Sequence, residues 1–142
     1  MAELKERILQ ILQQPQMASL ATITPDGKPW VRYVMTTASP DMVIRCATFI
    51  SARKVSQIKK NPEVHLTCGV TDPRKMGPYL QIQGRATLST DKAVRHSFWS
   101  DMLAGIFSGP DDPNYGVIEI KPYCIEYVSP PSHKPEIWTA GK

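Results

Sequence analysis

The sequence predicts a mainly β protein with helices, an α+β fold built as an antiparallel six-stranded β-barrel with peripheral helices. Two observations support this fold class. Segments with strand character follow one another along most of the chain, and helical segments lie between and outside them. Strands and helices alternate too rarely for a doubly wound parallel sheet. The chain has 142 residues, so we expect one domain over residues 1–128 and a Pro-rich tail over residues 129–142.

The strands are predicted from apolar alternation and from the turn residues that separate them. Residues 24–27, Thr-Pro-Asp-Gly, are a strong turn signal between the first two strands, which we expect to form a hairpin. The last strand alternates well and contains Pro122, which favours a bend or an edge position. The predicted strands are residues 17–23, 29–37, 42–48, 64–70, 79–88 and 115–128.

Three further segments have apolar residues at the spacing of amphipathic helices. In the first, Leu4, Ile8 and Leu12 share one face, and in the last, Val94 and Phe98 do so. The predicted helices are residues 3–12, 52–60 and 91–107.

Composition excludes several classes of protein. The net charge of +4 and pI near 9.0 are mildly basic, and the chain lacks the Lys/Arg runs of a nucleic-acid-binding tail. Cys46, Cys68 and Cys124 have no Cys-x-x-Cys spacing, so we expect neither disulfides nor a metal site. No apolar run approaches the roughly 18 residues of a membrane span, and the polar, amphipathic first segment argues against a signal peptide. We therefore expect a cytoplasmic protein.

The first turn of the second predicted helix carries an unusual charge. We expect Ser51 as its N-cap, followed at once by Arg53 and Lys54. The start of a helix has free N–H groups and the positive end of the helix dipole, where acidic residues are normally favoured. The two cations are explained if an anion such as phosphate binds there. The alternative is that both side chains extend into water.

Arg32 lies in the middle of an otherwise apolar predicted strand. Alternation places it on the same face as Trp30 and Val34. An Arg in this position needs a partner or a path to water, and a phosphate suits its planar fork of donors. The alternative is an Arg on a solvated strand face.

An ordered set of short motifs resembles the pyridoxamine 5'-phosphate oxidase-related flavoproteins, which bind FMN in a split β-barrel. A later segment, residues 109–113 (Gly-Pro-Asp-Asp-Pro), is similar to the general stress protein 26 branch of that family. The resemblance extends over about residues 17–128. The motifs are Pro29-x-x-Arg32, Ser51-x-Arg53-Lys54-Val55-x-Gln57-Ile58, Asn61-Pro62-x-Val64 and Gly84-Arg85-Ala86.

The resemblance implies FMN as the cofactor and a homodimer with the cofactor site at the subunit interface. It places the FMN phosphate on Arg32, Arg53 and Lys54, with Ser51 nearby. It places backbone groups of Tyr33, Val34 and Met35 along the flavin ring. It also places Thr48 and Phe49 along the ribityl chain, and Tyr79 where the oxidases use a Gln against the flavin.

Part of the oxidase pattern is missing. The oxidases hold the substrate phosphate with a C-terminal segment rich in Arg and His, and here no Arg follows Arg95. The resemblance therefore implies an FMN-binding oxidoreductase of unknown substrate, while the missing segment argues against pyridoxamine phosphate oxidase activity itself, and no residue stands out as catalytic. The alternatives are a non-catalytic flavin-binding stress or sensor protein and a split barrel that uses deazaflavin or haem. A basic barrel that binds single-stranded nucleic acid is disfavoured, because aromatic and cationic residues do not interleave.

Two histidines and two aspartates are further candidates for functional side chains. His65 and His96 are isolated, so we expect no metal or haem ligand there. Asp111 and Asp112 lie in a loop rich in Gly and Pro, where we expect them to form turns.

Overall fold

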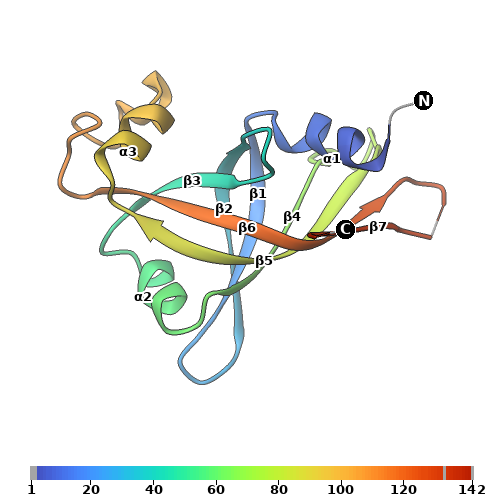
Figure 1. Ribbon diagram of the computed structural model, residues 1–142, viewed down its shortest axis with the longest axis horizontal. Coiled ribbons are helices and arrows are strands. Elements are labelled where there is room, and N and C mark those ends of the chain that lie inside the picture. The colour runs from blue at the N-terminus through green and yellow to red at the C-terminus, as the bar shows by residue number, and fades with distance from the viewer. Residues whose placement is uncertain (1–2, 133, 142) are drawn as a thin grey trace.

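The computed structural model describes residues 3–132 and 134–141, and it confirms the antiparallel β-barrel (Figure 1). The strand order is β3-β2-β1-β4-β5-β6-β7, and a further pairing of β3 with β6 closes the first six strands into a barrel. All pairings are antiparallel. The strands are β1 (Gln16–Ile23), β2 (Pro29–Ala38), β3 (Ile44–Phe49), β4 (Glu63–Cys68), β5 (Tyr79–Ser89), β6 (Tyr115–Val128) and β7 (Glu136–Thr139); the helices are α1 (Leu4–Leu12), α2 (Arg53–Lys60), α3 (Lys92–Phe98) and the short 3-10 helix η1 (Asp101–Leu103).

Two strands are shorter than the sequence predicts, each because of a residue with positive φ. The third strand begins at Ile44 because Met42 has a φ of 75°, inside a turn closed by the Ser39 carbonyl. The fourth ends at Cys68 because Gly69 has a φ of 115°. A Cβ at Gly69 would lie 2.9 Å from the Pro78 carbonyl oxygen, so only glycine fits there.

The long helix predicted over residues 91–107 is wrong. Helix α3 ends at Phe98, Trp99 turns out of it, and η1 follows. The rings of Trp99 and Phe107 both contact Tyr115, with centroids 5.6 Å and 5.0 Å away. In one continuous helix these two rings would lie about 12 Å apart along the axis, too far to share a partner. Packing on Tyr115 therefore overrides the helical pattern.

The N-cap predicted at Ser51 is also wrong, because helix α2 begins one residue later than expected. Ala52 has the extended backbone of the N-cap and makes no side-chain hydrogen bond to the first turn. The start of α2 thus lacks the acceptor that a Ser cap would supply.

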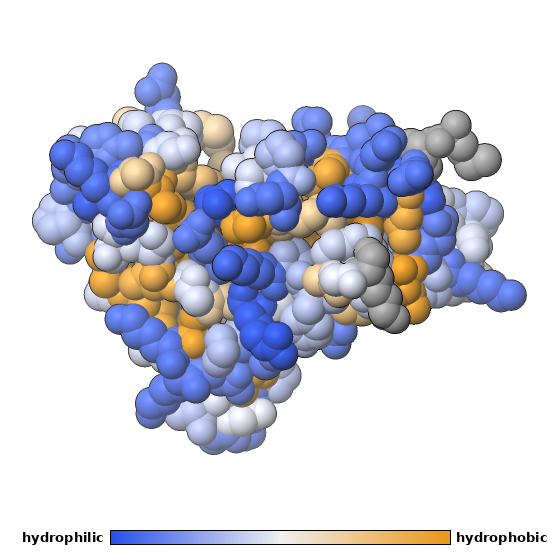
Figure 2. Space-filling view, in the orientation of Figure 1, coloured by the Kyte–Doolittle hydropathy of each residue, from blue (hydrophilic) through white to orange (hydrophobic). Residues whose placement is uncertain are grey.

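The core fills the barrel between α1 and α2, which lie at opposite ends of it in Figure 1. Ile8 and Leu12 of α1 and Ile58 of α2 pack on the fully buried side chains of the strands. The view in Figure 2 shows a largely hydrophilic face, with apolar side chains gathered on the left between the positions of α3 and α2. The barrel is therefore covered at both ends but keeps apolar surface on its side.

The Pro-rich segment after residue 128 contains an additional strand. Strand β7 pairs with β6, and Trp138 packs against the core. Arg7 of α1 also forms an ion pair with Glu136 at 2.6 Å. Within the described residues, no helix has the length and apolar character needed to cross a membrane.

Candidate functional site

A pocket of about 460 Å³ lies on the outside of the barrel, between strands β2 and β3 and the segment that joins α3 to β6. One side is formed by apolar residues of that segment, which we call the apolar wall: Phe98, Met102, Leu103, Ile106 and Phe107. The other side contains six residues that the sequence implicated in cofactor binding. They are Tyr33, Val34, Met35, Thr48, Phe49 and Lys54.

Tilted contacts between aromatic rings hold the apolar wall against the barrel. The Phe49 and Phe107 centroids are 4.7 Å apart, and Phe107 in turn packs on the buried Tyr115. The Tyr115 hydroxyl donates a hydrogen bond of 3.0 Å to the Arg95 carbonyl of α3. Contacts of this kind between rings stabilise by about 0.5–1.5 kcal/mol each beyond the burial of area. These contacts therefore fix the positions of the aromatic side chains that line the pocket.

Arg32 points toward the inner side of the barrel, since it shares a strand face with the buried Val34. Its guanidinium donates to Thr22 Oγ1 at 2.9 Å, to Gln57 Oε1 at 3.2 Å and to the Leu20 carbonyl at 3.2 Å. All these acceptors are neutral. Half-burial lowers the pKa of Arg32, and the nearby charge of Arg53 lowers it further. The interpretation of Arg32 as a solvated surface residue is therefore excluded.

Lys54 lies near Arg32 and adds a second positive charge, which lines the pocket. Burial lowers the pKa of Lys54, and the Arg32 charge adds to this effect. Cys46 is the nearby group that could oppose it, but burial raises the pKa of that thiol to about 12, so it is neutral at pH 7. Arg53 is exposed and its guanidinium carbon lies 5.7 Å from the Trp30 ring centroid. These three basic residues, Arg32, Arg53 and Lys54, are named the cation cluster.

The cation cluster has no acidic partner within residues 3–132 and 134–141. The ion pairs found there involve other basic residues. The first turn of α2 also contains no acidic residue, and its N-cap offers no side-chain acceptor. Its free N–H groups and the helix dipole add to the positive potential. The cluster therefore forms an electropositive site suited to an anion at the edge of an apolar pocket.

Four of the implicated residues do not line the pocket: Arg32 and Arg53, which lie beside Lys54 in the cation cluster, and Ser51 and Tyr79. Ser51 is exposed in the turn before α2. Tyr79 lines a separate, more open hollow of about 750 Å³ together with Met76 and Asp72. Tyr33 lines both hollows and is the residue that connects them.

Sequence reasoning missed the neutral partners of Arg32 and the entire apolar wall. Thr22 is buried and Gln57 is nearly so, and their side chains are hydrogen-bonded to each other. A Gln on the apolar side of an amphipathic helix is a signal that could have identified Gln57. The exposed Met102 and Ile106 fall within the helix predicted over residues 91–107, and nothing local in the sequence places them opposite β2 and β3.

The isolated histidines do not form a metal site. His65 is exposed on β4, and His96 Nε2 lies 2.7 Å from Asp111 Oδ1. The described residues contain no group of His, Cys, Asp and Glu side chains that could hold a metal ion. Asp112 accepts hydrogen bonds from two backbone N–H groups of its own loop, as expected for a turn former. Asp111 instead pairs with His96, whose hydrogen bond lowers the pKa of Asp111.

Comparison with known proteins identifies the family. The family model described as pyridoxamine 5'-phosphate oxidase matches residues 4–129. The chain belongs to the pyridoxamine 5'-phosphate oxidase family. Within this family it is 31% identical over 127 residues to general stress protein 26 of Bacillus subtilis (strain 168), with 89% of both chains covered. The crystal structure of general stress protein 26 from Bacillus anthracis str. Sterne is 30% identical, with a TM-score of 0.84, and 97% of this chain and 99% of that chain are covered.

More distant neighbours of this family member share its fold alone. A structure named F420 reductase is 24% identical with a TM-score of 0.67, covering 88% of this chain and 98% of that one. A pyridoxamine 5'-phosphate oxidase-related, FMN binding protein from Nostoc punctiforme PCC 73102 is 18% identical with a TM-score of 0.67, covering 86% and 78%. The same barrel thus occurs in proteins with different names.

Proposed function

We propose that this member of the pyridoxamine 5'-phosphate oxidase family binds FMN and acts as an oxidoreductase. The observation that carries the proposal is the cation cluster, which has no acidic partner among the described residues and reaches an apolar pocket through Lys54. In this proposal Arg32, Arg53 and Lys54 hold the phosphate. The pocket residues of β2 and β3 then contact the rest of the cofactor.

The residues present fit FMN in both charge and polarity. A phosphate with up to two negative charges matches the cluster and the free N–H groups of α2. Hydrogen bonds to charged groups contribute about 1.5–3 kcal/mol each, so two or three of them supply much of the affinity of a tightly bound cofactor. The aromatic and aliphatic side chains of the pocket suit a flat heteroaromatic ring.

When bound, FMN supplies the transfer of a hydride or of electrons. The protein side chains bind and orient: Lys54 and Arg32 place the charged end, and the β2 and β3 residues of the pocket, Phe49 among them, cover the ring end. Apart from Lys54, the ionisable side chain that lines the described pocket is Tyr33, which is 75% exposed. The chain therefore contributes position and charge rather than a buried acid or base.

We also propose a homodimer with the cofactor site at the subunit interface. Val31, Tyr33 and Met35 on the outer face of β2 are 63%, 75% and 44% exposed, and two of them line the pocket. An apolar strand face beside a ligand pocket is typical of a surface that subunits bury. Light scattering that gives twice the chain mass of 15.9 kDa supports the dimer, and a mass of one chain contradicts it. The free thiols of Cys46, Cys68 and Cys124 support a reducing, cytoplasmic location.

The visible absorption spectrum of the purified protein, with and without added FMN, tests the proposed cofactor. We expect flavin bands that remain with the protein on gel filtration. Lys54→Glu should abolish them, whereas Lys59→Glu in the last turn of the same helix should leave them in place. A colourless protein that ignores FMN, or equal loss in both variants, would remove the proposal's support.

Deazaflavin is the second candidate cofactor, because a structural neighbour is named F420 reductase. Competition between FMN and a deazaflavin for the cofactor-free protein separates the two. A non-catalytic flavin-binding protein is the second candidate function, favoured by the lack of a buried acid or base in the pocket. Turnover of a reduced nicotinamide with an electron acceptor supports the oxidoreductase, and a bound flavin that is never turned over supports the non-catalytic protein.

A further inference from the structure

We propose that the apolar wall selects an uncharged aromatic substrate and excludes phosphorylated ones. This inference rests on the proposed function, because it concerns the ligand that binds beside FMN. It names the class of substrate, which neither the family nor the relatives specify for this chain. The inference follows from how charge is distributed around the pocket.

Positive charge lies on one side of the pocket, and the wall side carries no charged lining residue. The cation cluster comes from β2 and α2. The side chains that line the pocket on the wall side are Phe98, Ser100, Met102, Leu103, Ile106 and Phe107, and none of them is charged. Once FMN phosphate occupies the cluster, a second phosphate or carboxylate at the wall meets no cation among the wall residues that line the pocket. Such an anion loses its hydration without gaining a partner, which is unfavourable.

The wall is apolar where the pocket opens to solvent. Met102 and Ile106 line the pocket and are still 60% and 56% exposed. Large exposed apolar side chains at the entrance of a pocket mark a surface that an apolar ligand can cover. Facing the wall, the ring of Phe49 is 45% exposed and is supported from behind by the buried Phe107, with centroids 4.7 Å apart, so it provides aromatic surface. These features favour a flat, neutral ring.

One polar group on the wall side can orient such a ring. Ser100 lines the pocket, and its hydroxyl makes no hydrogen bond to any other residue in the described ranges. A hydroxyl can donate to, or accept from, an oxygen on the ligand without requiring charge. A substrate with an aromatic ring and one neutral oxygen substituent therefore matches the wall better than a phosphate ester.

The test compares naphthol with naphthyl phosphate, two ligands with the same ring and different charge, on the FMN-loaded protein. Binding is measured from the perturbation of the flavin absorption bands. We expect naphthol to bind at least about tenfold more tightly. Met102→Lys, which adds a cation to the wall, should weaken naphthol and strengthen naphthyl phosphate. Met76→Lys is the matched control, because Met76 is similarly exposed at 55% but lines the other hollow.

The outcomes distinguish a failure of the proposed substrate selection from a failure of the proposed FMN binding. Equal affinity for the two ligands, or no change in Met102→Lys relative to Met76→Lys, overturns the selection of uncharged substrates while FMN binding stands. If FMN itself does not bind, the proposed function fails instead. Naphthol fluorescence is then measured on the cofactor-free protein, where loss of binding in Met102→Lys supports the role of the wall and unchanged binding overturns it.

Discussion

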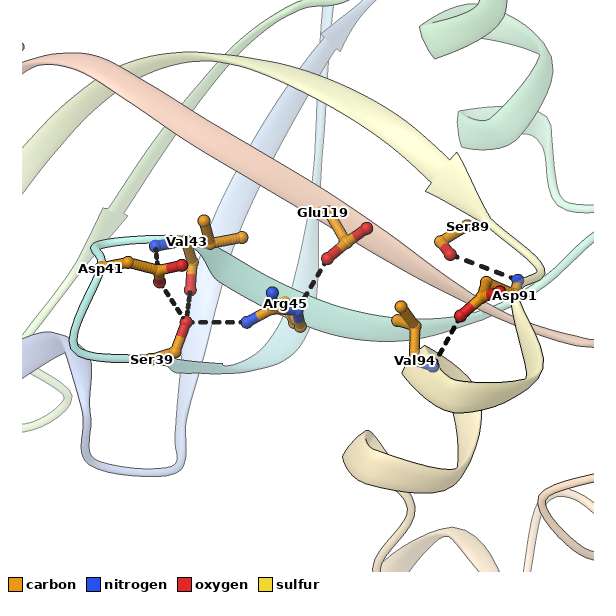
Figure 3. A network of polar contacts seen from close by, with 8 residues as sticks. All are labelled: Ser39, Asp41, Val43, Arg45, Ser89, Asp91, Val94 and Glu119. Atoms are coloured by element: carbon orange, nitrogen blue, oxygen red, sulfur yellow. Dashed lines mark hydrogen bonds and ion pairs between the residues drawn. The ribbon is translucent and has the colours of Figure 1, made fainter.

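Two half-buried arginines on neighbouring strands of the barrel differ in what neutralises them. Arg45 of β3 donates from Nε to Glu119 Oε2 at 2.9 Å and from Nη1 to Ser39 Oγ at 2.8 Å. Figure 3 shows these contacts continuing to Asp41 in the turn before β3. Arg32 of β2 contacts only neutral oxygens among the described residues and has another cation nearby.

The difference separates a structural arginine from one that we propose binds a ligand. The Arg45 pair joins β3 to β6, the pairing that closes the barrel. Its charge is fully matched within the protein. The charge of Arg32 is held in place by Thr22 and Gln57 but is not neutralised. A positive charge that is fixed in position without a partner costs stability, and it is retained when a ligand supplies the missing anion.

The largest effect is expected from Arg32→Gln. Removing the charge should weaken FMN binding by roughly 10- to 100-fold, because a hydrogen bond to a charged group contributes about 1.5–3 kcal/mol. The thermal stability of the cofactor-free protein should stay the same or rise, since the charge of Arg32 is disfavoured where it lies. Fluorescence titration with FMN and thermal unfolding measure the two effects. Unchanged FMN affinity in a folded variant would show that Arg32 is only structural.

The same substitution at Arg45 should have the opposite profile. Arg45→Gln leaves Glu119 without its partner at a site where the two side chains are 25% and 21% exposed. We expect a loss of about 1 kcal/mol in the free energy of unfolding, measured in urea, with FMN affinity unchanged. A variant that keeps its stability but loses FMN would erase the distinction between the two arginines.

A smaller effect is expected from alkaline pH, through Lys54. Its pKa in the cofactor-free protein lies below the ordinary value of 10.5. At pH values between the lowered pKa of Lys54 in the folded protein and 10.5, Lys54 is protonated in the unfolded chain but largely neutral in the folded one. The unfolded chain therefore binds more protons, so the stability of the cofactor-free protein rises with pH in this interval. FMN binding favours protonated Lys54, so FMN affinity should fall a few-fold in the same interval. Lys54→Met should abolish this pH dependence, and its persistence in that variant would assign it to another group.

The sequence predicted the barrel because its strands pair mainly with neighbours along the chain, so local alternation carries most of the topology. The strand over residues 115–128 matches β6 at both ends. The break after α3 could not be predicted, since it depends on Trp99 and Phe107 meeting Tyr115. The cap of α2 was missed because capping depends on backbone angles, which one residue type does not fix.

The sequence predicted only those site residues whose type is unusual at their position. A cation in an apolar strand, and cations at a helix start, conflict with local rules and so identified Arg32, Arg53 and Lys54. The neutral partners of Arg32 come from β1 and α2, and the apolar wall comes from a segment far along the chain. These residues obey local rules, so only the folded structure shows that they belong to the site.

The most direct test of the central claim compares the affinity of the cofactor-free protein for FMN and for riboflavin, which lacks the phosphate. If the cation cluster holds the phosphate, FMN should bind at least about 100-fold more tightly than riboflavin. Arg32→Gln should reduce that preference, and Arg45→Gln should leave it intact. Equal affinity of the unaltered protein for the two flavins would contradict the account.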